Sequence, residues 1–416
     1  MEPRRVVVTG LGALTPIGNT LSEYWENLLD GESGAARITY FDPELFKTQF
    51  ACELKNFDPL DHMDRKESRK YDRFAQYALV STAEALKDSN LLLDKLNKDR
   101  IGVIWGAGIG GLETFQNEVL NFAASNENPR FNPFFIPKMI ADIAPGLISI
   151  KYGFRGPNFA TVSACASASN AMIDALNYIR LGYADIMVTG GSEAAVTKAG
   201  IGGFNAMHAL SKRNDDPKTA SRPFDNDRDG FVLGEGAGTL ILESYEHATA
   251  RGAKIYAELA GGGLSADAHH MTAPHPEGLG AIKVMENCLR DAKLNPKDVD
   301  AINMHGTSTP LGDIAESNAI ISVFKEHTYS MNINSTKSMT GHLLGAAGAI
   351  EAIASIMAIR NDIMPPTINH QTPDEGIDQK INFTFHKPQK RIINVALSNT
   401  FGFGGHNACV LFKKIP

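Results

Sequence analysis

Cys165 lies in the stretch TVSACASASN (161–170), where its neighbours are all small side chains. The preceding NFATV has the composition of a strand, and the following apolar residues recur at helical spacing: Ala168, Met172, Ala175, Leu176 and Ile179. We therefore expect Cys165 on a strand–turn–helix elbow, where open amides and the helix dipole lower a thiol's pKa. Small neighbours leave room for a substrate carbonyl, so Cys165 is a candidate nucleophile. The alternative is a packed, inert cysteine.

Two further stretches carry side chains suited to acid, base or hydrogen-bonding chemistry. NMHGTSTPLGD (303–313) places His305 at the end of a predicted strand, and NSTKSMTGHLLGAAGAIEA (334–352) places Lys337 and His342 before a helix of small residues. Glu351 lies inside that apolar helix, where an unpartnered carboxylate is costly. We expect Lys337 or a histidine as its partner, either for catalysis or as a plain structural salt bridge.

The glycine-rich stretch NTFGFGGHN (399–407) predicts a loop whose backbone approaches a reacting centre. One of its amides is a candidate for an oxyanion hole. The glycine turns at 10–12 and 106–110 lack the GxGxxG spacing with a later acidic residue, which argues against a dinucleotide site. His269, His270 and His275 suggest a metal site or, because Pro274 and Pro276 interrupt them, a lid loop, which we favour. We expect no metal and no cofactor.

Strands that run into glycine turns recur along the chain and must position these residues. In the first half they lie at 5–18, 100–111, 184–194 and 235–244, and in the second half at 254–267, 298–310, 391–405 and 406–413. In both halves a helix of small residues precedes the last strand pair. This order predicts an α/β protein with an internal duplication. We place the two halves at 1–253, with the cysteine, and 254–416, with the histidines and the glycine loop.

Composition narrows the function classes. The 416 residues are 43% hydrophobic, and the net charge of −7 gives no overall basic footprint for nucleic acid. The cysteines at 52, 165, 288 and 409 show neither CxxC spacing nor a disulfide framework, which fits a reducing compartment. The apolar run after Arg5 is too short for a signal peptide, and the segment 343–359 contains Glu351 and is too short to span a membrane. We expect a cytoplasmic protein without membrane contact.

Six motifs together resemble the β-ketoacyl-acyl-carrier-protein synthases, the condensing enzymes of fatty-acid synthesis, of type II more than type I. They cover almost the whole chain in family order: VVVTGLGALTPIGN, FDNDRDGFVLGEGAG, DAHHMTAPHPEG, HGTSTPLGD, KSMTGHLLGAAG and NTFGFGGHN. Ser163 stands where many members have Thr. The resemblance implies the thiolase fold, a duplicated five-layered αβαβα, and a homodimer. It also implies decarboxylative Claisen condensation of malonyl-acyl-carrier protein with an acyl group on Cys165, which lengthens the chain by two carbons.

The resemblance further implies a role for each motif residue. Cys165 matches the acyl-accepting nucleophile, His305 and His342 the paired histidines, and the amides of Cys165 and Phe403 the oxyanion hole. Lys337 and Glu351 match the supporting ion pair of the family. Thr307 and Thr309 match the residues that hold the pantetheine arm, and Phe401 matches the gating phenylalanine.

DRKESRKYDR (64–73) predicts a basic helical stripe in an otherwise acidic protein: Arg65, Lys66, Arg69, Lys70 and Arg73. Such a run is usually a solvated face. Because carrier proteins are acidic, we also consider Lys66, Arg69 and Lys70 as a docking site for acyl carrier protein.

Three other functions compete with the condensing enzyme. A thiolase of the same fold is expected to use a second cysteine near the C-terminal glycine loop, but Cys409 falls within the following strand. A non-catalytic chain-length partner typically lacks the nucleophile, and Cys165 is present. A Cys–His hydrolase stays open, as do the preferred acyl chain length, the tolerance of unsaturated primers and the binding of a monovalent cation.

Overall fold

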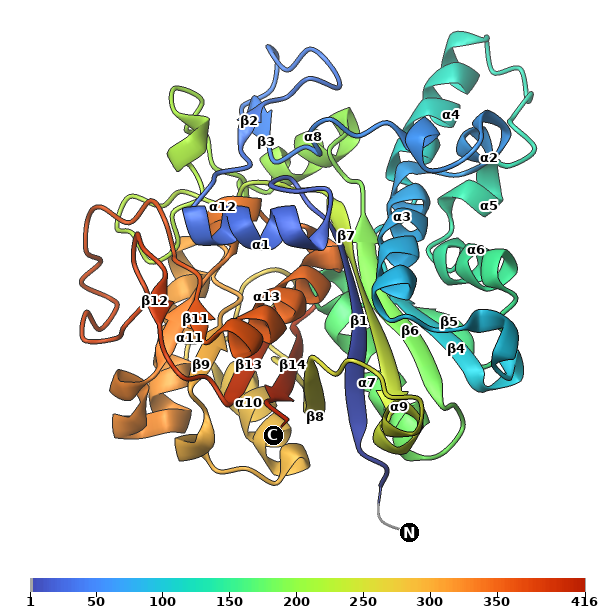
Figure 1. Ribbon diagram of the computed structural model, residues 1–416. Coiled ribbons are helices and arrows are strands. Elements are labelled where there is room, and N and C mark those ends of the chain that lie inside the picture. Colours follow the sequence, from blue (N-terminus) through green and yellow to red (C-terminus); the bar gives the residue numbers. More distant parts are fainter. Residues whose placement is uncertain (1–2, 416) are drawn as a thin grey trace.

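The computed structural model describes residues 3–415 and is built around one sheet of ten strands (Figure 1). Their order across the sheet is β10-β9-β13-β14-β8-β1-β7-β6-β4-β5. In chain order these strands are β1 (Val6–Leu14), β4 (Ile101–Gly106), β5 (Asn158–Thr161), β6 (Ile186–Glu193), β7 (Gly236–Ser244), β8 (Ala257–Ala266), β9 (Ala301–Asn303), β10 (Asn332–Asn334), β13 (Val395–Gly402) and β14 (His406–Lys413). Two short pairs lie outside it: β2 (Ala36–Arg37) with β3 (Phe50–Ala51), and β11 (Ile363–Met364) with β12 (Gln389–Lys390).

The strand order repeats on the two sides of the sheet's centre. On one side β1, β7 and β6 pair antiparallel, and β4 and β5 continue parallel to β6. On the other side β8, β14 and β13 pair antiparallel, and β9 and β10 continue parallel to β13. Among the strands of residues 3–415, β1 and β8 are the pair that joins the two halves of the sheet, through the register pairs Val7–Glu258 and Val8–Ala257. This arrangement confirms the predicted duplication, while the boundary at residue 253 stays a prediction.

The helices form three layers around the two halves of the sheet. They are α1 (Leu21–Asp30), α2 (Arg65–Lys70), α3 (Arg73–Asp88), α4 (Leu112–Ala124), α5 (Phe135–Met139), α6 (Ile143–Tyr152), α7 (Ser167–Arg180), α8 (Lys198–Ala206), α9 (Tyr245–Ala250), α10 (Leu279–Ala292), α11 (Pro310–Phe324), α12 (Lys337–Thr340) and α13 (Ala347–Asn361). α3 and α6 cover the outer face of the first half, and α10, with α11 against it, covers the second. α7 and α13 pack between the halves. The layers therefore follow the expected αβαβα order.

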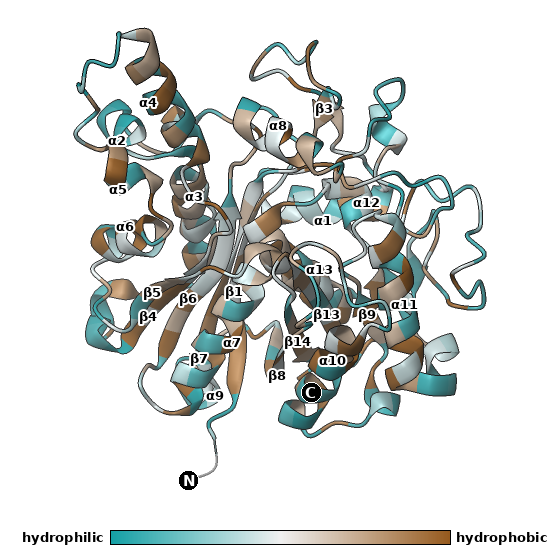
Figure 2. Cartoon of the chain, turned by 180° about the vertical axis from the view of Figure 1, so that it is seen from behind, coloured by the Kyte–Doolittle hydropathy of each residue, from teal (hydrophilic) through white to brown (hydrophobic). Residues whose placement is uncertain are grey.

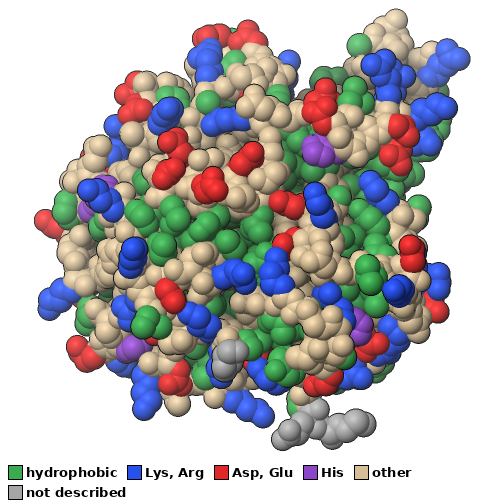
Figure 3. Space-filling view, in the orientation of Figure 1, with side chains coloured by type: hydrophobic (Ala, Val, Ile, Leu, Met, Phe, Trp, Pro, Cys, Tyr) green, Lys and Arg blue, Asp and Glu red, His purple; other side chains and the backbone are tan. Residues whose placement is uncertain are grey.

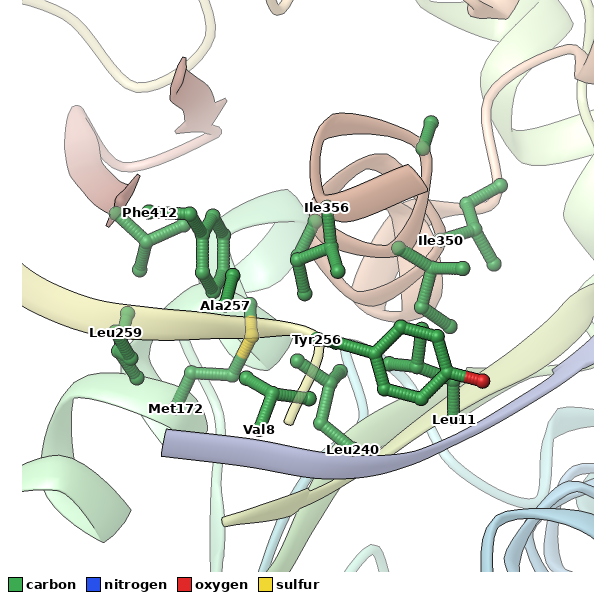
Figure 4. Close-up of a cluster of buried hydrophobic side chains, with 14 of the residues drawn as sticks. Val8, Leu11, Met172, Leu240, Tyr256, Ala257, Leu259, Ile350, Ile356 and Phe412 are labelled. Carbon is green, nitrogen blue, oxygen red and sulfur yellow. The ribbon is translucent and has the colours of Figure 1, made fainter. Parts of the chain in front are cut away.

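The central core draws on both halves of the chain. Figure 4 shows Met172 of α7 and Ile356 of α13 beside Val8, Leu240 and Phe412 of three different strands, and all five side chains are fully buried. Hydrophobic residues also dominate α13, β13 and β14 at the centre of Figure 2. Strands that are buried on both faces need such near-continuous apolar runs.

Glycines in β1 allow a helix to pack unusually close to the sheet. A Cβ atom on Gly12 would lie 2.1 Å from the backbone oxygen of Ser81 in α3, and one on Gly10 would lie 2.4 Å from that of Ala85. The glycine turn that the sequence predicts after the first apolar run is therefore part of the strand itself, and it sets the distance between β1 and α3. Within residues 3–415 no helix is long and apolar enough to cross a membrane.

Candidate active site

Cys165 lies on a sharp elbow between β5 and α7, as the sequence predicts. Ala164 adopts a left-handed backbone (φ 50°) and begins a 3-10 turn, Ala164–Ala166, that leads directly into the helix. The hydroxyl of Ser167 closes this turn, donating to the Ala164 carbonyl at 2.6 Å and accepting from the Ser163 amide at 3.0 Å. The elbow therefore presents the sulfur from a rigid backbone, and Cys165 itself is 8% exposed.

A second elbow with the same geometry carries His342 to the cysteine. Leu344 is left-handed (φ 47°) and begins the 3-10 turn Leu344–Ala346 before α13. The backbone of His342 is held on both sides, since its amide donates to Val232 at 2.7 Å and its carbonyl accepts from Gly234 at 2.9 Å. Its Nε2 lies 3.0 Å from Cys165 Sγ.

His305 completes a histidine pair at the end of β9. Its ring centroid lies 5.2 Å from that of His342 at an interplanar angle of 87°. The carboxylate of Glu316 accepts its backbone amide at 2.9 Å and fixes the turn. Burial, followed by the positive charge of Lys337, holds the pKa of both imidazoles well below the usual 6.5. Both histidines are therefore neutral at pH 7 and can donate an N–H.

The partner of Glu351, which the sequence left open, is Lys337. The two side chains form a direct ion pair and each is 1% exposed. Burial raises the pKa of Glu351 to about 7, although the Lys337 ammonium opposes this shift. The pair therefore places a fixed positive charge behind the histidines.

The expected lowering of the thiol pKa is wrong. Burial raises the pKa of Cys165 to about 12, and the opposing charge of Lys337 and the Phe403 amide do not offset it. Cys165 lies among apolar side chains that include Leu233 and Leu344, and such an environment disfavours a thiolate. The resting site therefore holds a neutral thiol beside a neutral imidazole.

The glycine-rich loop reaches the cysteine from the β13–β14 turn. Gly404 and Gly405 are left-handed (φ 86° and 72°), which turns the chain so that the Phe403 amide donates toward the Cys165 sulfur. Gly402 packs so closely that a Cβ there would lie 3.1 Å from the Cys165 amide. The Phe403 and Cys165 amides are the two that the sequence predicts for an oxyanion hole, and that role stays a prediction. The ring of Phe401 lies 5.6 Å from that of His305.

A cavity of about 590 Å³ leads to these residues. Thr307 and Thr309 line it, with their hydroxyl oxygens 3.0 Å apart. Arg228 supports this turn by donating to the carbonyls of Thr309 at 3.1 Å and Pro310 at 2.7 Å. The segment 272–275 lines the same cavity, as a lid loop would.

Residues 3–415 contain no group of three or more His, Cys, Asp and Glu side chains arranged to hold a metal ion. His269 and His275 contact each other edge to face, with ring centroids 5.0 Å apart. Cys409, which a thiolase reaction would need near the loop, is buried within β14, where it pairs with Asn399 of β13.

The basic stripe is shorter than the sequence predicts. α2 ends at Lys70, Tyr71 is extended, and a new helix starts at Arg73. Arg73 turns inward and pairs with Glu113 at 2.8 Å, so its place in the stripe is wrong. The other basic residues of the stripe are exposed: Arg65, Lys66, Arg69 and Lys70. Figure 3 shows Lys and Arg side chains on the upper right lobe, where Figure 1 places α2 and α4.

Sequence reasoning missed two buried carboxylates that organise the site. Glu316 holds the amides of His305 and Gly306, and Glu193 accepts four amides from two loops beside Cys165. Their signal is an acidic residue at the end of a strand or within a helix where every neighbour is apolar or small. Such a residue needs nearby donors.

A buried cysteine beside two neutral histidines, reached by a cavity and carried on a duplicated αβαβα fold, is the arrangement of a condensing enzyme of the thiolase type. The chain belongs to the β-ketoacyl synthase family. Residues 3–248 match the model of the β-ketoacyl synthase N-terminal domain, and residues 256–371 match that of the C-terminal domain.

Relatives of known name and structure extend over the full chain. The chain is 49% identical to 3-oxoacyl-[acyl-carrier-protein] synthase 2 of Synechocystis sp., covering 100% of this chain and 99% of the relative. It is 50% identical to the protein of the same name from Staphylococcus aureus, covering 99% of each. A β-ketoacyl synthase from Burkholderia phymatum has a TM-score of 0.92 at 33% identity, covering 99% of this chain and 100% of that structure. A type II polyketide ketosynthase bound to its acyl-carrier protein has a TM-score of 0.91 at 35% identity and covers 100% of both chains.

Proposed function

We propose that this protein is a 3-oxoacyl-acyl-carrier-protein synthase that condenses malonyl-acyl-carrier protein with an acyl group held on Cys165. The observation that carries the proposal is the 3.0 Å approach of His342 Nε2 to Cys165 Sγ at the floor of the cavity, with His305 packed against His342. The reaction is a decarboxylative Claisen condensation that lengthens a fatty acyl chain by two carbons.

The first half-reaction is acyl transfer to Cys165. The sulfur attacks the carbonyl of an acyl thioester, the bond to the carrier thiol breaks, and the thiol proton passes to that leaving thiol. As the thiol loses its proton, negative charge develops on the sulfur and is stabilised by hydrogen-bond donors. His342, in its Nε2–H tautomer, donates to the sulfur, and the amides of Cys165 and Phe403 hold the carbonyl oxygen.

The second half-reaction uses the histidine pair. Malonyl-carrier protein loses CO₂ as the bond to its carboxylate carbon breaks, which leaves an enolate. Once Cys165 is acylated, His342 is free to donate to the enolate oxygen together with His305. The enolate carbon attacks the acyl carbonyl, and collapse of the tetrahedral intermediate expels the Cys165 thiolate. Burial and, after it, the charge of Lys337 held by Glu351 keep both imidazoles neutral, so that each donates an N–H without forming an ion pair with the malonyl carboxylate.

The remaining predicted roles belong to the approach of the substrates. Thr307 and Thr309 line the cavity, and Phe401 lines it too, with its ring 5.6 Å from that of His305. We assign the two threonines to the arm and Phe401 to a gate that opens after acylation. The exposed residues Lys66, Arg69 and Lys70 would dock the acidic carrier protein, as supported by a related ketosynthase whose structure contains one.

A homodimer fits two surfaces of the chain. β5 is an edge strand of the ten-stranded sheet, and unpaired backbone groups on an edge favour pairing with another strand. The neighbouring helices α4 and α5 and the loop between them expose large apolar side chains: Phe115, Val119, Leu120, Phe131, Phe134 and Ile136. A second copy of the chain would cover both surfaces. We place the enzyme in the cytoplasm, where carrier proteins and their substrates are made available.

Product analysis tests this function against the Cys–His hydrolase. The protein is incubated with acyl- and malonyl-loaded carrier protein, and the products are analysed by mass spectrometry. The proposal expects a carrier-bound 3-oxoacyl chain longer by two carbons and one CO₂ released per condensation. Free fatty acid without chain extension would establish the hydrolase instead. Varying the primer length in the same assay gives the chain-length preference.

A further inference from the structure

Glu193 is a buried carboxylate that joins two loops beside the nucleophile and has no part in the reaction steps above. It ends β6 and is 0% exposed. One oxygen, Oε2, accepts the amides of Gly108 at 2.7 Å and Gly345 at 3.1 Å, while Oε1 accepts those of Ile109 and Gly110, both at 3.1 Å. All hydrogen bonds that it accepts within residues 3–415 come from backbone amides.

The two loops that Glu193 joins, 108–110 and the elbow before α13, also pack against each other, and the 108–110 loop packs against the nucleophile elbow. A Cβ atom on Gly108 would lie 2.7 Å from Glu193 Oε2 and 3.2 Å from the Ala164 carbonyl of the nucleophile elbow. A Cβ atom on Gly345 would lie 2.1 Å from the Gly108 amide. A movement of the 108–110 loop is therefore transmitted directly to the elbow that presents Cys165.

The duplication shows what this carboxylate replaces. Gly345 is the second residue of the 3-10 turn before α13, as Cys165 is the second residue of the turn before α7. Under the proposed function the Cys165 amide of the α7 elbow donates to the substrate oxygen, whereas the corresponding Gly345 amide of the α13 elbow donates to Glu193 at 3.1 Å. Glu193 thus supplies an internal carboxyl acceptor for this amide, and burial raises the pKa of that carboxyl to about 7 although the four backbone amides oppose the shift.

The loops that Glu193 holds also shape the acyl cavity. Gly108, Ile109 and Leu344 line the cavity together with Cys165. Buried N–H groups that lose an acceptor are costly, so a loop without Glu193 would change its path. Long acyl chains contact more of this wall than short ones and would be affected more.

We infer that Glu193 is a positioning residue for the acylation of Cys165, which clamps the 108–110 loop and the α13 elbow and so fixes both the nucleophile elbow and the acyl-cavity wall. This inference rests on the proposed function. We expect Glu193 to affect the first half-reaction more than the decarboxylation, because Glu316 holds His305 and the segment 232–234 also holds the backbone of His342, three residues before Gly345.

The experiment compares Glu193→Gln and Glu193→Asp with the matched control Glu53→Gln. Glu53 is also a buried carboxylate held by loop amides, those of Thr39 and Tyr40, but it does not line the cavity. In Glu193→Gln an NH₂ group faces backbone donors, and in Glu193→Asp the shorter side chain cannot reach both loops at once. The measurements are acyl-Cys165 formation from short- and long-chain pantetheine thioesters, and decarboxylation of malonyl-pantetheine.

For both Glu193 variants we expect long-chain acylation to fall about tenfold or more. Short-chain acylation should fall less, decarboxylation should change by no more than about threefold, and the control should match the parent in all three. A Glu193 variant that keeps the parent's ratio of long- to short-chain acylation overturns the inference. If the parent itself forms no acyl-Cys165, the proposed function fails instead.

Hydrogen–deuterium exchange of the parent protein provides a readout that needs no variant. If one carboxylate holds both loops, the two loops open together. Peptides covering 107–111 and 343–346 should therefore lose protection from exchange in a single step. Exchange of the two peptides at unrelated rates overturns the inference even if neither Glu193 variant folds.

Discussion

The charge of Lys337 should set the lowest pH at which the histidine pair works. Burial and the Lys337 ammonium both lower the pKa of His305 and His342, so removal of that charge raises the pKa of both imidazoles. An imidazolium still donates an N–H, but its charge also stabilises the malonyl carboxylate that decarboxylation must convert to CO₂, so protonation should slow the reaction. In Lys337→Met the acid limb of malonyl-pantetheine decarboxylation should therefore move to higher pH than in the parent.

The ordinary histidine pKa of about 6.5 sets the upper limit of this shift. At that limit each histidine is about three-quarters protonated at pH 6.0, so both are neutral in only about 6% of molecules and the rate at pH 6.0 would be about one-sixteenth of that at pH 8.0. Because burial is the larger cause and remains in the variant, the loss should stop short of this value. The assay is the decarboxylation rate between pH 5.5 and 8.5, normalised to its plateau.

Glu351→Gln is the matched control, since it breaks the same buried ion pair and keeps the ammonium. Removal of either partner of a buried pair typically costs about 3–5 kcal/mol of stability, so both variants should unfold at lower temperature. Only Lys337→Met should move the acid limb upward. If both variants move it equally, or neither does, the electrostatic role of Lys337 is refuted and the pair is merely structural.

Three further outcomes are expected. Cys165→Ala should abolish condensation and leave measurable malonyl decarboxylation, because the enolate donors belong to His305 and His342. Phe401→Ala should raise malonyl-carrier decarboxylation by the unacylated enzyme relative to the unacylated parent, because the second substrate no longer waits for the first. Substitution of Lys66, Arg69 and Lys70 by Glu reverses the charge of the exposed basic residues. This variant should have a higher KM for carrier-bound substrate, with a reduced salt dependence, and nearly unchanged activity on a pantetheine thioester.

Each of these has a result that would contradict it. Normal elongation by Cys165→Ala would remove the cysteine from the mechanism. An unchanged ratio for Phe401→Ala, with thiol reactivity intact, would make the ring a wall of the cavity and not a gate. Equal loss on carrier-bound and pantetheine substrates in the charge-reversal variant would indicate a folding defect.

Much of the architecture could be predicted from the order of short patterns. Runs of apolar residues next to glycine turns located the strands that the first half contributes to the ten-stranded sheet, except β5, which the NFATV stretch indicated. The short pair of β2 and β3 was not predicted, and the repeat of the strand order indicated the duplication. The elbow at Cys165 followed from small residues between a strand and a helical pattern. These features depend on local sequence, which a single chain displays directly.

Properties that depend on tertiary surroundings could not be predicted in the same way. A helix N-terminus suggested an acidic thiol at Cys165, but burial by residues distant in sequence outweighs it. Helical spacing placed Arg73 in the basic stripe, but helix α2 ends before Tyr71 and the Arg73 guanidinium forms an ion pair with Glu113. The partner of Glu351 and the role of Glu193 depend on which loops converge in space.

The two matched elbows have a consequence for how the halves diverged. A side chain at Gly345 would collide with the Gly108 amide and with Glu193, so the second elbow cannot regain a nucleophile by a single substitution. A cysteine at position 345 would require both the replacement of Glu193 and a different path for the 108–110 loop. Replacement of Glu193 alone would leave buried amides without an acceptor. The collision at Gly345 and the loss of an acceptor for the buried amides therefore both oppose a second nucleophile. The fold has two equivalent elbows, and one of them carries the reactive cysteine.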